Sequence, residues 1–148
     1  MDIHLTAITE ADFSFVKRIY DYYTLHTTVV YFIEPVPLEE IRRMVPVGDR
    51  HYRSFLICGA DGERYGFCYF SQFKEKPAFR ISVEVTIYLV PECCGKGIGR
   101  QALLLLEPYI REGGFSNAVA LISAENEASI RLFEKCGYLC CAEIRDVA

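Results

Sequence analysis

The chain has 148 residues, which is the size of one domain and leaves little room for a second. Because 51% of the residues are hydrophobic and 24% are charged, the chain can build a core and is not of the disordered class. Sixteen Lys and Arg against 20 Asp and Glu give a net charge of −4 without a basic cluster, so we expect no nucleic-acid partner.

The N-terminus and the cysteines favour a cytoplasmic protein. The sequence does not open with a basic segment followed by an apolar one, and no apolar run approaches the roughly 18 residues of a membrane span. The seven cysteines form no C-x-x-C pair, and none of the three histidines adjoins a cysteine pair. We therefore expect no membrane partner, reduced thiols that in part fill the core, and no metal site.

The N-terminal third predicts one strand and two helices. Residues 3–8 alternate apolar and polar side chains, as a half-buried strand does. Thr9 or Asp12 can cap a helix, and the apolar face of that helix consists of Val16, Ile19, Tyr20 and Tyr23. Pro37 suits the first turn of a second helix, which Pro46 and Gly48 would end.

The middle of the sequence predicts three strands and a helix. Strand-like runs at 54–58 and 65–73 flank the turn Ala60-Asp61-Gly62, which indicates a hairpin. A β-rich run at 79–90 follows, and after a glycine loop comes a helix with the apolar residues Leu103, Leu106 and Ile110. Pro108 lies inside this helix and predicts a kink or an early end.

The C-terminal part predicts a strand, a helix and a last strand. Residues 119–122 read as a short buried strand, Asn126 can cap a helix through Cys136, and Gly137 can stop it. Residues 138–144 would form the last strand. This order predicts a single domain over 1–148 of the α/β (α+β) class, with a mixed sheet and helices on both faces.

The glycine loop is a candidate phosphate site. Gly95, Gly97 and Gly99 lie between a strand and a helix, where backbone N–H groups and the helix N-terminus can hold a phosphate, and Lys96 and Arg100 add positive charge. Arg100 excludes the dinucleotide fingerprint, because it occupies the third glycine position, and Gly97 excludes a Walker loop, because Ser or Thr would follow Lys96 there. An ordinary tight turn is the alternative.

Two segments around this loop resemble motifs of the GNAT N-acetyltransferases. Residues 87–100 resemble the motif that binds the pyrophosphate of acetyl-CoA, and residues 126–138 resemble the second cofactor-binding motif of the same family. Residues 19–40, 76–80 and 83–88 are similar to the phosphinothricin and methionine-sulfone acetyltransferase branch. The resemblance covers about residues 3–147 and implies a GNAT-like, mostly antiparallel sheet with acetyl-CoA as the cofactor.

The resemblance also implies roles for individual residues. Glu84 matches the general base, and half-burial would raise its pKa to suit that role. The pantetheine arm would lie along Ile87, Tyr88 and Leu89, where a local bulge would direct an N–H at the thioester oxygen. The other cofactor contacts would be Cys94, Gly95, Lys96, Gly97, Ile98, Gly99, Arg100, Asn126, Ser129 and Phe133, although Asn126 can equally be a simple helix cap. The acceptor contacts would be Tyr31, Phe32, Phe79 and Arg80, and Arg80 could meet an acceptor carboxylate.

Four features depart from the family pattern. Cys94 replaces the usual Arg or Gln, Phe133 replaces a Tyr or His that could protonate the thiolate, and Phe32 stands where relatives often carry an acidic residue. Relatives continue past residues 143–147 into a last strand that inserts between the two preceding ones, and we expect that last strand of the family to be missing here. We expect residues 138–144 to pair with the strand at 119, or a partner subunit to cover that edge in a homodimer.

The sequence therefore predicts an N-acetyltransferase that moves the acetyl group of acetyl-CoA directly to the primary amine of a small amino-acid-like acceptor. One alternative is a GNAT-like module that binds acyl-CoA but is weakly active or inactive. Another is a structural domain with a coincidental glycine loop, which would not bind CoA.

Overall fold

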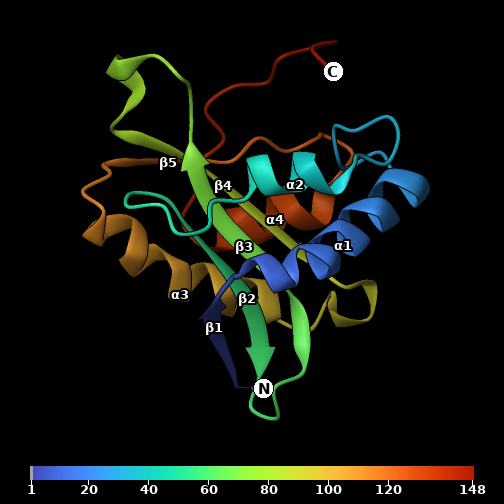
Figure 1. Cartoon of the computed structure of the whole chain (residues 1–148). Helices are drawn as coiled ribbons and strands as arrows, with labels where there is room; N and C mark the ends of the chain where they lie inside the picture. Colours follow the sequence, from blue (N-terminus) through green and yellow to red (C-terminus); the bar gives the residue numbers. More distant parts are fainter. Residues whose placement is uncertain (1) are drawn as a thin grey trace.

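A five-stranded sheet forms the centre of the molecule in the computed structural model, which describes residues 2–148 (Figure 1). The strands lie side by side in chain order: β1 (Ile3–Ala7), β2 (Arg53–Gly59), β3 (Arg64–Gln72), β4 (Ser82–Leu89) and β5 (Asn117–Val119). The first four pair antiparallel, and β5 runs parallel to β4. The predicted mixed, mostly antiparallel sheet is thus confirmed.

Helices cover both faces of this sheet, as predicted (Figure 1). The α-helices are α1 (Phe13–His26), α2 (Leu38–Met44), α3 (Ile98–Glu112) and α4 (Glu127–Lys135), and the short 3₁₀ helices are η1 (Glu10–Asp12), η2 (Pro77–Phe79) and η3 (Pro91–Cys93). One buried cluster lies under α1 and α2, and a second lies under α3 and α4. Cys58 and Cys68 belong to these clusters, which confirms cysteine as part of the core. Within residues 2–148 no helix has the length and apolar character that a membrane crossing requires.

Asp12, one of the two predicted caps, is the N-cap residue of α1, but its side chain makes no capping hydrogen bond to that helix. Its carboxylate instead accepts a hydrogen bond from the Thr9 N–H at 2.9 Å, across η1, which leads into α1. Val16, Ile19 and Tyr20 are buried against the sheet. The 3.6-residue periodicity therefore identified the packed face correctly.

The hairpin between β2 and β3 also forms where it was predicted. Asp61 accepts a hydrogen bond from the Glu63 N–H at 3.0 Å, and Gly62 adopts a φ of +84°, a backbone conformation that favours glycine.

The last strand of the sheet is short and lies two residues earlier than predicted. β5 pairs only with residues 82–84 of β4, and the Asn117 side chain donates to the Ser82 hydroxyl at 3.3 Å. Residues 120–122 leave the sheet. Ala120 and Ile122 pack against the core cluster under α3, and all three residues line a cavity. Residues 85–89 of β4 consequently have no strand partner on the β5 side within the described chain.

Three other sequence predictions were wrong in part. Residues 138–144 form no strand: Leu139 is 85% exposed and Ile144 is 71% exposed, and within residues 2–148 nothing pairs with this segment. α3 does not end at Pro108 but continues to Glu112, because the burial of Ile110 stabilises its last turn. β4 begins at Ser82 rather than at residue 79, because residues 77–79 form η2.

Candidate active site

The face of β4 that carries Glu84 is turned toward α1. Side chains alternate along a strand, so Val83 and Val85 point to the cluster under α3, while Glu84, Thr86 and Tyr88 share the opposite face. On the neighbouring strand β3, Ser71, Tyr69 and Phe67 lie directly opposite these three residues. Glu84 thus stands at the end of a row that is otherwise aromatic or hydroxylic.

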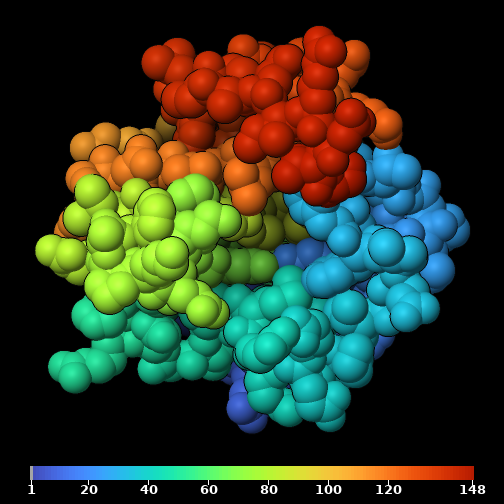
Figure 2. Space-filling view, turned by 90° about the horizontal axis from the view of Figure 1, so that it is seen from above, coloured from blue at the N-terminus to red at the C-terminus, as the bar shows by residue number. Residues whose placement is uncertain are grey.

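A cavity of about 170 Å³ opens above this row, at the place where β5 leaves β4. Figure 2 shows a hollow on this side of the molecule, bordered by the segment after α1 (light blue), the segment after β3 (yellow-green) and the C-terminal segment (red). The predicted site residues that line the cavity are Tyr31, Phe32, Glu84, Ile87, Tyr88, Asn126, Ser129 and Phe133. Above it, the Thr28 hydroxyl donates to Glu125 at 2.5 Å, which ties the segment after α1 to the segment before α4.

Burial raises the pKa of the Glu84 carboxyl, and the positive charge of Lys74 offsets part of this rise. The direction follows because partial burial disfavours the charged form of an acid. A carboxylate with a raised pKa is a better proton acceptor at neutral pH than an exposed one.

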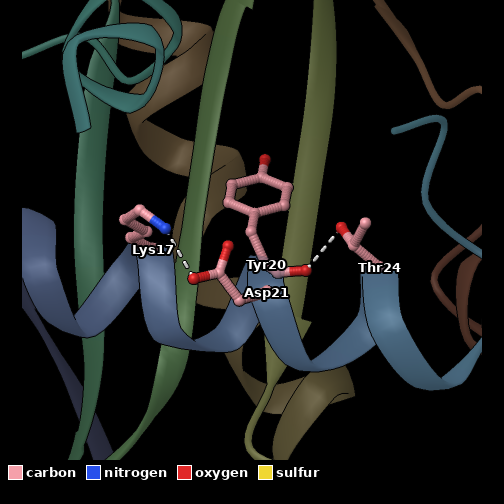
Figure 3. Close-up of polar contacts among 4 residues, drawn as sticks. All are labelled: Lys17, Tyr20, Asp21 and Thr24. Atoms are coloured by element: carbon pink, nitrogen blue, oxygen red, sulfur yellow. Dashed lines mark hydrogen bonds and ion pairs between the residues drawn. The ribbon is translucent and has the colours of Figure 1, made fainter. Parts of the chain in front are cut away.

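Two tyrosines that the sequence analysis did not assign to the site complete the wall of the cavity. The Tyr20 and Tyr69 hydroxyls are hydrogen-bonded at 2.8 Å, and the Tyr20 ring lies 5.1 Å from the Tyr88 ring. Figure 3 shows the Tyr20 phenol extending from α1 toward β3 and β4, while Lys17 and Asp21 form an ion pair at 2.6 Å on the same helix. One signal was available: a buried tyrosine, unlike a phenylalanine, needs a partner for its hydroxyl.

The glycine loop presents backbone N–H groups outward. Gly95 has a φ of +76° and Gly97 a φ of +80°, and both are exposed. Among residues 2–148, no acceptor takes the N–H groups of residues 95–97, and the first N–H groups of α3 follow directly. This geometry fits a diphosphate, since consecutive free N–H groups at a helix N-terminus attract anions.

The free edge of β4 fits an extended, amide-containing chain. Val90 donates its N–H to Tyr65 of β3 at 2.9 Å, so by alternation Ile87 and Leu89 direct their backbone groups away from β3. The Tyr23 hydroxyl donates to the Leu89 carbonyl at 2.6 Å. The bulge expected at 87–89 is absent from the pairing of β3 with β4, which is continuous from Leu89 back to Val83.

Three other residues that were predicted to contact the cofactor are Asn126, Phe133 and Cys94. Asn126 caps α4 by accepting the Ser129 N–H at 3.2 Å, and Phe133 is buried with its ring 4.9 Å from Tyr138. The exposed Cys94 thiol lies 3.6 Å from the Tyr23 hydroxyl. Because a phenyl ring has no acidic proton, Phe133 cannot act as a proton donor in this position.

Phe79 and Arg80 do not line the cavity. Arg80 donates to the Pro77 carbonyl at 3.2 Å, and the Phe79 ring packs edge-on at 5.9 Å from Phe73. Within residues 2–148, no three potential metal ligands lie together.

Comparison with known proteins gives the family. The profile of the acetyltransferase (GNAT) domain matches residues 2–139, which is nearly the whole chain. The chain belongs to the GNAT acetyltransferase family. It is therefore a GNAT N-acetyltransferase family enzyme, and the cofactor of GNAT enzymes is acetyl-CoA.

Two curated relatives cover almost the same region of this GNAT chain. The phosphinothricin N-acetyltransferase of Streptomyces coelicolor is 30% identical over 93% of this chain and 82% of its own length. The L-methionine sulfoximine/L-methionine sulfone acetyltransferase of Salmonella typhimurium is 29% identical over 93% of this chain and 81% of its own length. Over most of its length the chain is therefore similar to the phosphinothricin and methionine-sulfone acetyltransferases, the branch indicated by its sequence motifs.

A solved structure agrees with the fold and the cofactor. A GNAT superfamily phosphinothricin acetyltransferase from Sinorhizobium meliloti, in complex with acetyl-CoA, superimposes with a TM-score of 0.85 at 30% identity. The match covers 93% of this chain and 75% of the solved one.

Proposed function

We propose that this GNAT domain transfers the acetyl group of acetyl-CoA directly to the primary amine of a small acceptor derived from an amino acid. The observation that carries the proposal is the position of Glu84. Its half-buried carboxyl lies in a small cavity beside the free edge of β4. The amino-acid derivatives acetylated by the two curated relatives support this acceptor class.

Different residues of the chain would bind the cofactor and accept the proton. The free N–H groups of residues 95–97 and of the start of α3 would hold the diphosphate, and the backbone of Ile87 and Leu89 would pair with the pantetheine arm. Acetyl-CoA would supply the acetyl group when bound: the C–N bond to the acceptor forms, the C–S bond of the thioester breaks, and the electron pair of that bond leaves on sulfur. Glu84 accepts the proton that the ammonium form of the acceptor must lose before it can attack, and the second proton, which the nitrogen loses as the amide forms, passes to water.

Phe133 of α4 cannot supply the proton for the departing thiolate. It lines the cavity at the position where relatives carry Tyr or His, and a phenyl ring has no acidic proton. In this proposal another group or water supplies that proton, or the thiolate leaves as the anion.

Thiol release from acetyl-CoA over a panel of amines tests the proposal. We expect Glu84→Gln to lower turnover by about 10²- to 10⁴-fold, the usual contribution of a general base, while the affinity for acetyl-CoA changes less than twofold. Glu112→Gln removes an exposed carboxylate at the end of α3 and serves as the matched control. Unchanged turnover of Glu84→Gln would contradict the role of Glu84.

An acyl-CoA-binding module without activity is the second candidate, and Phe133 is the observation that favours it. CoA binding in calorimetry, without thiol release from acetyl-CoA in the presence of any amine, would decide for that module.

A homodimer and a cytoplasmic location stay proposals. The exposed apolar side chains of Leu139, Ile144 and Val147 support association, because a second copy would bury them.

A further inference from the structure

The acceptor cavity carries one kind of charge. Glu84 is the only lining residue with a charged side chain among those that the structure describes. The other lining residues are uncharged, and the polar side chains among them, apart from the tyrosines, are Thr86, Asn126 and Ser129. A negative group and neutral walls attract a cation and repel an anion.

Aromatic rings gather around this carboxylate. Tyr20 is the centre of the group, with the Phe32 ring at 5.6 Å and the Tyr88 ring at 5.1 Å. Tyr31 and Glu84 line the same cavity, and burial and then the negative charge of Glu84 raise the pKa of Tyr31. Ring faces attract ammonium groups, and this attraction is stronger where water is partly excluded.

Lys74 and Arg80, two basic residues of the segment between β3 and β4, do not line the cavity. Lys74 is close enough to influence Glu84, but its side chain is exposed and its ammonium lies 5.2 Å from the Phe73 ring. Arg80 is exposed and bonded to the Pro77 carbonyl. The free carboxylate of an α-amino acid would therefore enter beside Glu84 and meet no cationic partner on the cavity wall.

We propose that the acceptor is a monocationic amine without a free carboxylate, whose aromatic or branched aliphatic body lies among Tyr31, Phe32 and Tyr88. Such an acceptor is the decarboxylated, amidated or esterified counterpart of an amino acid. The inference rests on the proposed function, because it assigns the chemistry of the group that receives the acetyl.

Matched ligand pairs test this inference by binding, without turnover. The full chain, saturated with CoA, is titrated in a calorimeter with 2-phenylethylamine, phenylalanine amide and phenylalanine, and then with 3-methylbutylamine and leucine. We expect the amine and the amide to bind at least tenfold more tightly than the free amino acid. Equal or tighter binding of the amino acids, or no binding of any of the five compounds, would overturn the inference.

Three variants test whether the Tyr31 ring binds the ammonium group of the acceptor or Lys74 binds a carboxylate. Tyr31 is 54% exposed, so its replacement should be tolerated. We expect Tyr31→Leu to weaken amine binding about five- to tenfold and Tyr31→Phe, which keeps the ring, to leave it within twofold. Lys74→Ala should not weaken amine binding. If an acceptor carboxylate were held by Lys74, this variant would instead lose affinity for phenylalanine, and that result would contradict the inference.

Thiol release measured on the same compounds distinguishes the two proposals. If the amines bind preferentially but release no thiol from acetyl-CoA, the acceptor inference stands and acetyl transfer fails. If phenylalanine and leucine release thiol faster than their amines, acetyl transfer stands and the acceptor inference fails.

Discussion

Glu84 shows how the position of one residue in a sheet determines its chemistry. It is the residue of β4 at which the pairing with β5 ends, and its side chain points into the cavity rather than into the core beneath α3. The raised pKa is a consequence of this half-buried position. The same shift also makes the stability of the fold depend on pH.

The sign of that dependence is determined by the direction of the shift. The folded state holds the Glu84 proton to a higher pH than the unfolded state, in which the pKa is about 4.3. The unfolded state therefore binds fewer protons in this window, and the free energy of unfolding falls as the pH rises through it. We expect Glu84→Gln to be more stable than the parent chain at pH 7 and to lose this advantage near pH 4.

Urea unfolding at the two pH values measures this effect. Glu112→Gln again serves as the control, because an exposed carboxylate should give no such difference. A stability advantage of Glu84→Gln that is the same at both pH values, or larger at pH 4, would argue against a destabilising buried charge.

At the scale of single residues, the sequence selected some of the side chains that line the cavity. Glu84, Tyr31 and Phe32, predicted as site residues from the resemblance to the family, line it together. Tyr20 and Tyr69 were not, because their hydrogen bond joins residues 49 positions apart on a helix and a strand. No local pattern records which two hydroxyls the packing of α1 on β3 brings together.

Among the elements, the contact between β3 and β4 positions the proposed cofactor edge. Gly66 of β3 lies opposite Leu89, and a Cβ at this glycine would collide with the Tyr88 carbonyl oxygen and approach the Leu89 Cα to 2.8 Å. Both of these are backbone atoms, so the strands themselves would have to separate. Because Gly66 has no side chain, β3 can approach the backbone of residues 88–89 this closely.

We expect Gly66→Ala to lower the free energy of unfolding by about 1–3 kcal/mol, the usual cost of overpacking. We also expect weaker CoA binding, because the displaced backbone is the proposed edge for the pantetheine arm. Gly62→Ala is the matched variant, since its strain comes from a φ of +84° in the turn between β2 and β3, and its Cβ would meet no atom within 4 Å. Denaturation and calorimetry on both variants check this, and equal CoA affinities for the two would refute the link between Gly66 and the edge.

Elements with a strong local signal were predicted well. The capped helix at 13–26 and the hairpin around Gly62 depend on contacts within a few residues, and both formed as expected. β5 and residues 138–144 were predicted from apolar runs alone. An apolar run becomes a strand only where a neighbouring edge is available, and that condition is set by the tertiary structure.

Across the whole molecule, β3 joins two separate cores. Phe67 is fully buried under α1, and Phe70, three residues later, is fully buried under α3. The two rings have different neighbours: Phe67 lies 5.3 Å from Tyr20, and Phe70 lies 6.0 Å from Phe115. Each face of the sheet therefore contributes its own share of the stability.

We expect Phe67→Ala and Phe70→Ala each to cost about 3–5 kcal/mol, as large-to-small changes in packed cores do. Only Phe67→Ala should also weaken acceptor binding, because it removes the support of Tyr20 and Tyr88. Urea unfolding gives the first quantity, and calorimetry with 2-phenylethylamine on the folded fraction gives the second. A cost below 1 kcal/mol for either variant would show that its core is not closely packed.

The divergence of β5 from β4 has a consequence for how two reactants can meet. The sheet forks after Glu84, and the cavity at the fork is lined by Tyr20 of α1 and by Ser129 and Phe133 of α4. The thioester would come along the open side toward α4, and the amine would come from the side of α1. Neither has to leave before the other arrives, and the reaction would proceed in a ternary complex, without an acetylated side chain as a relay.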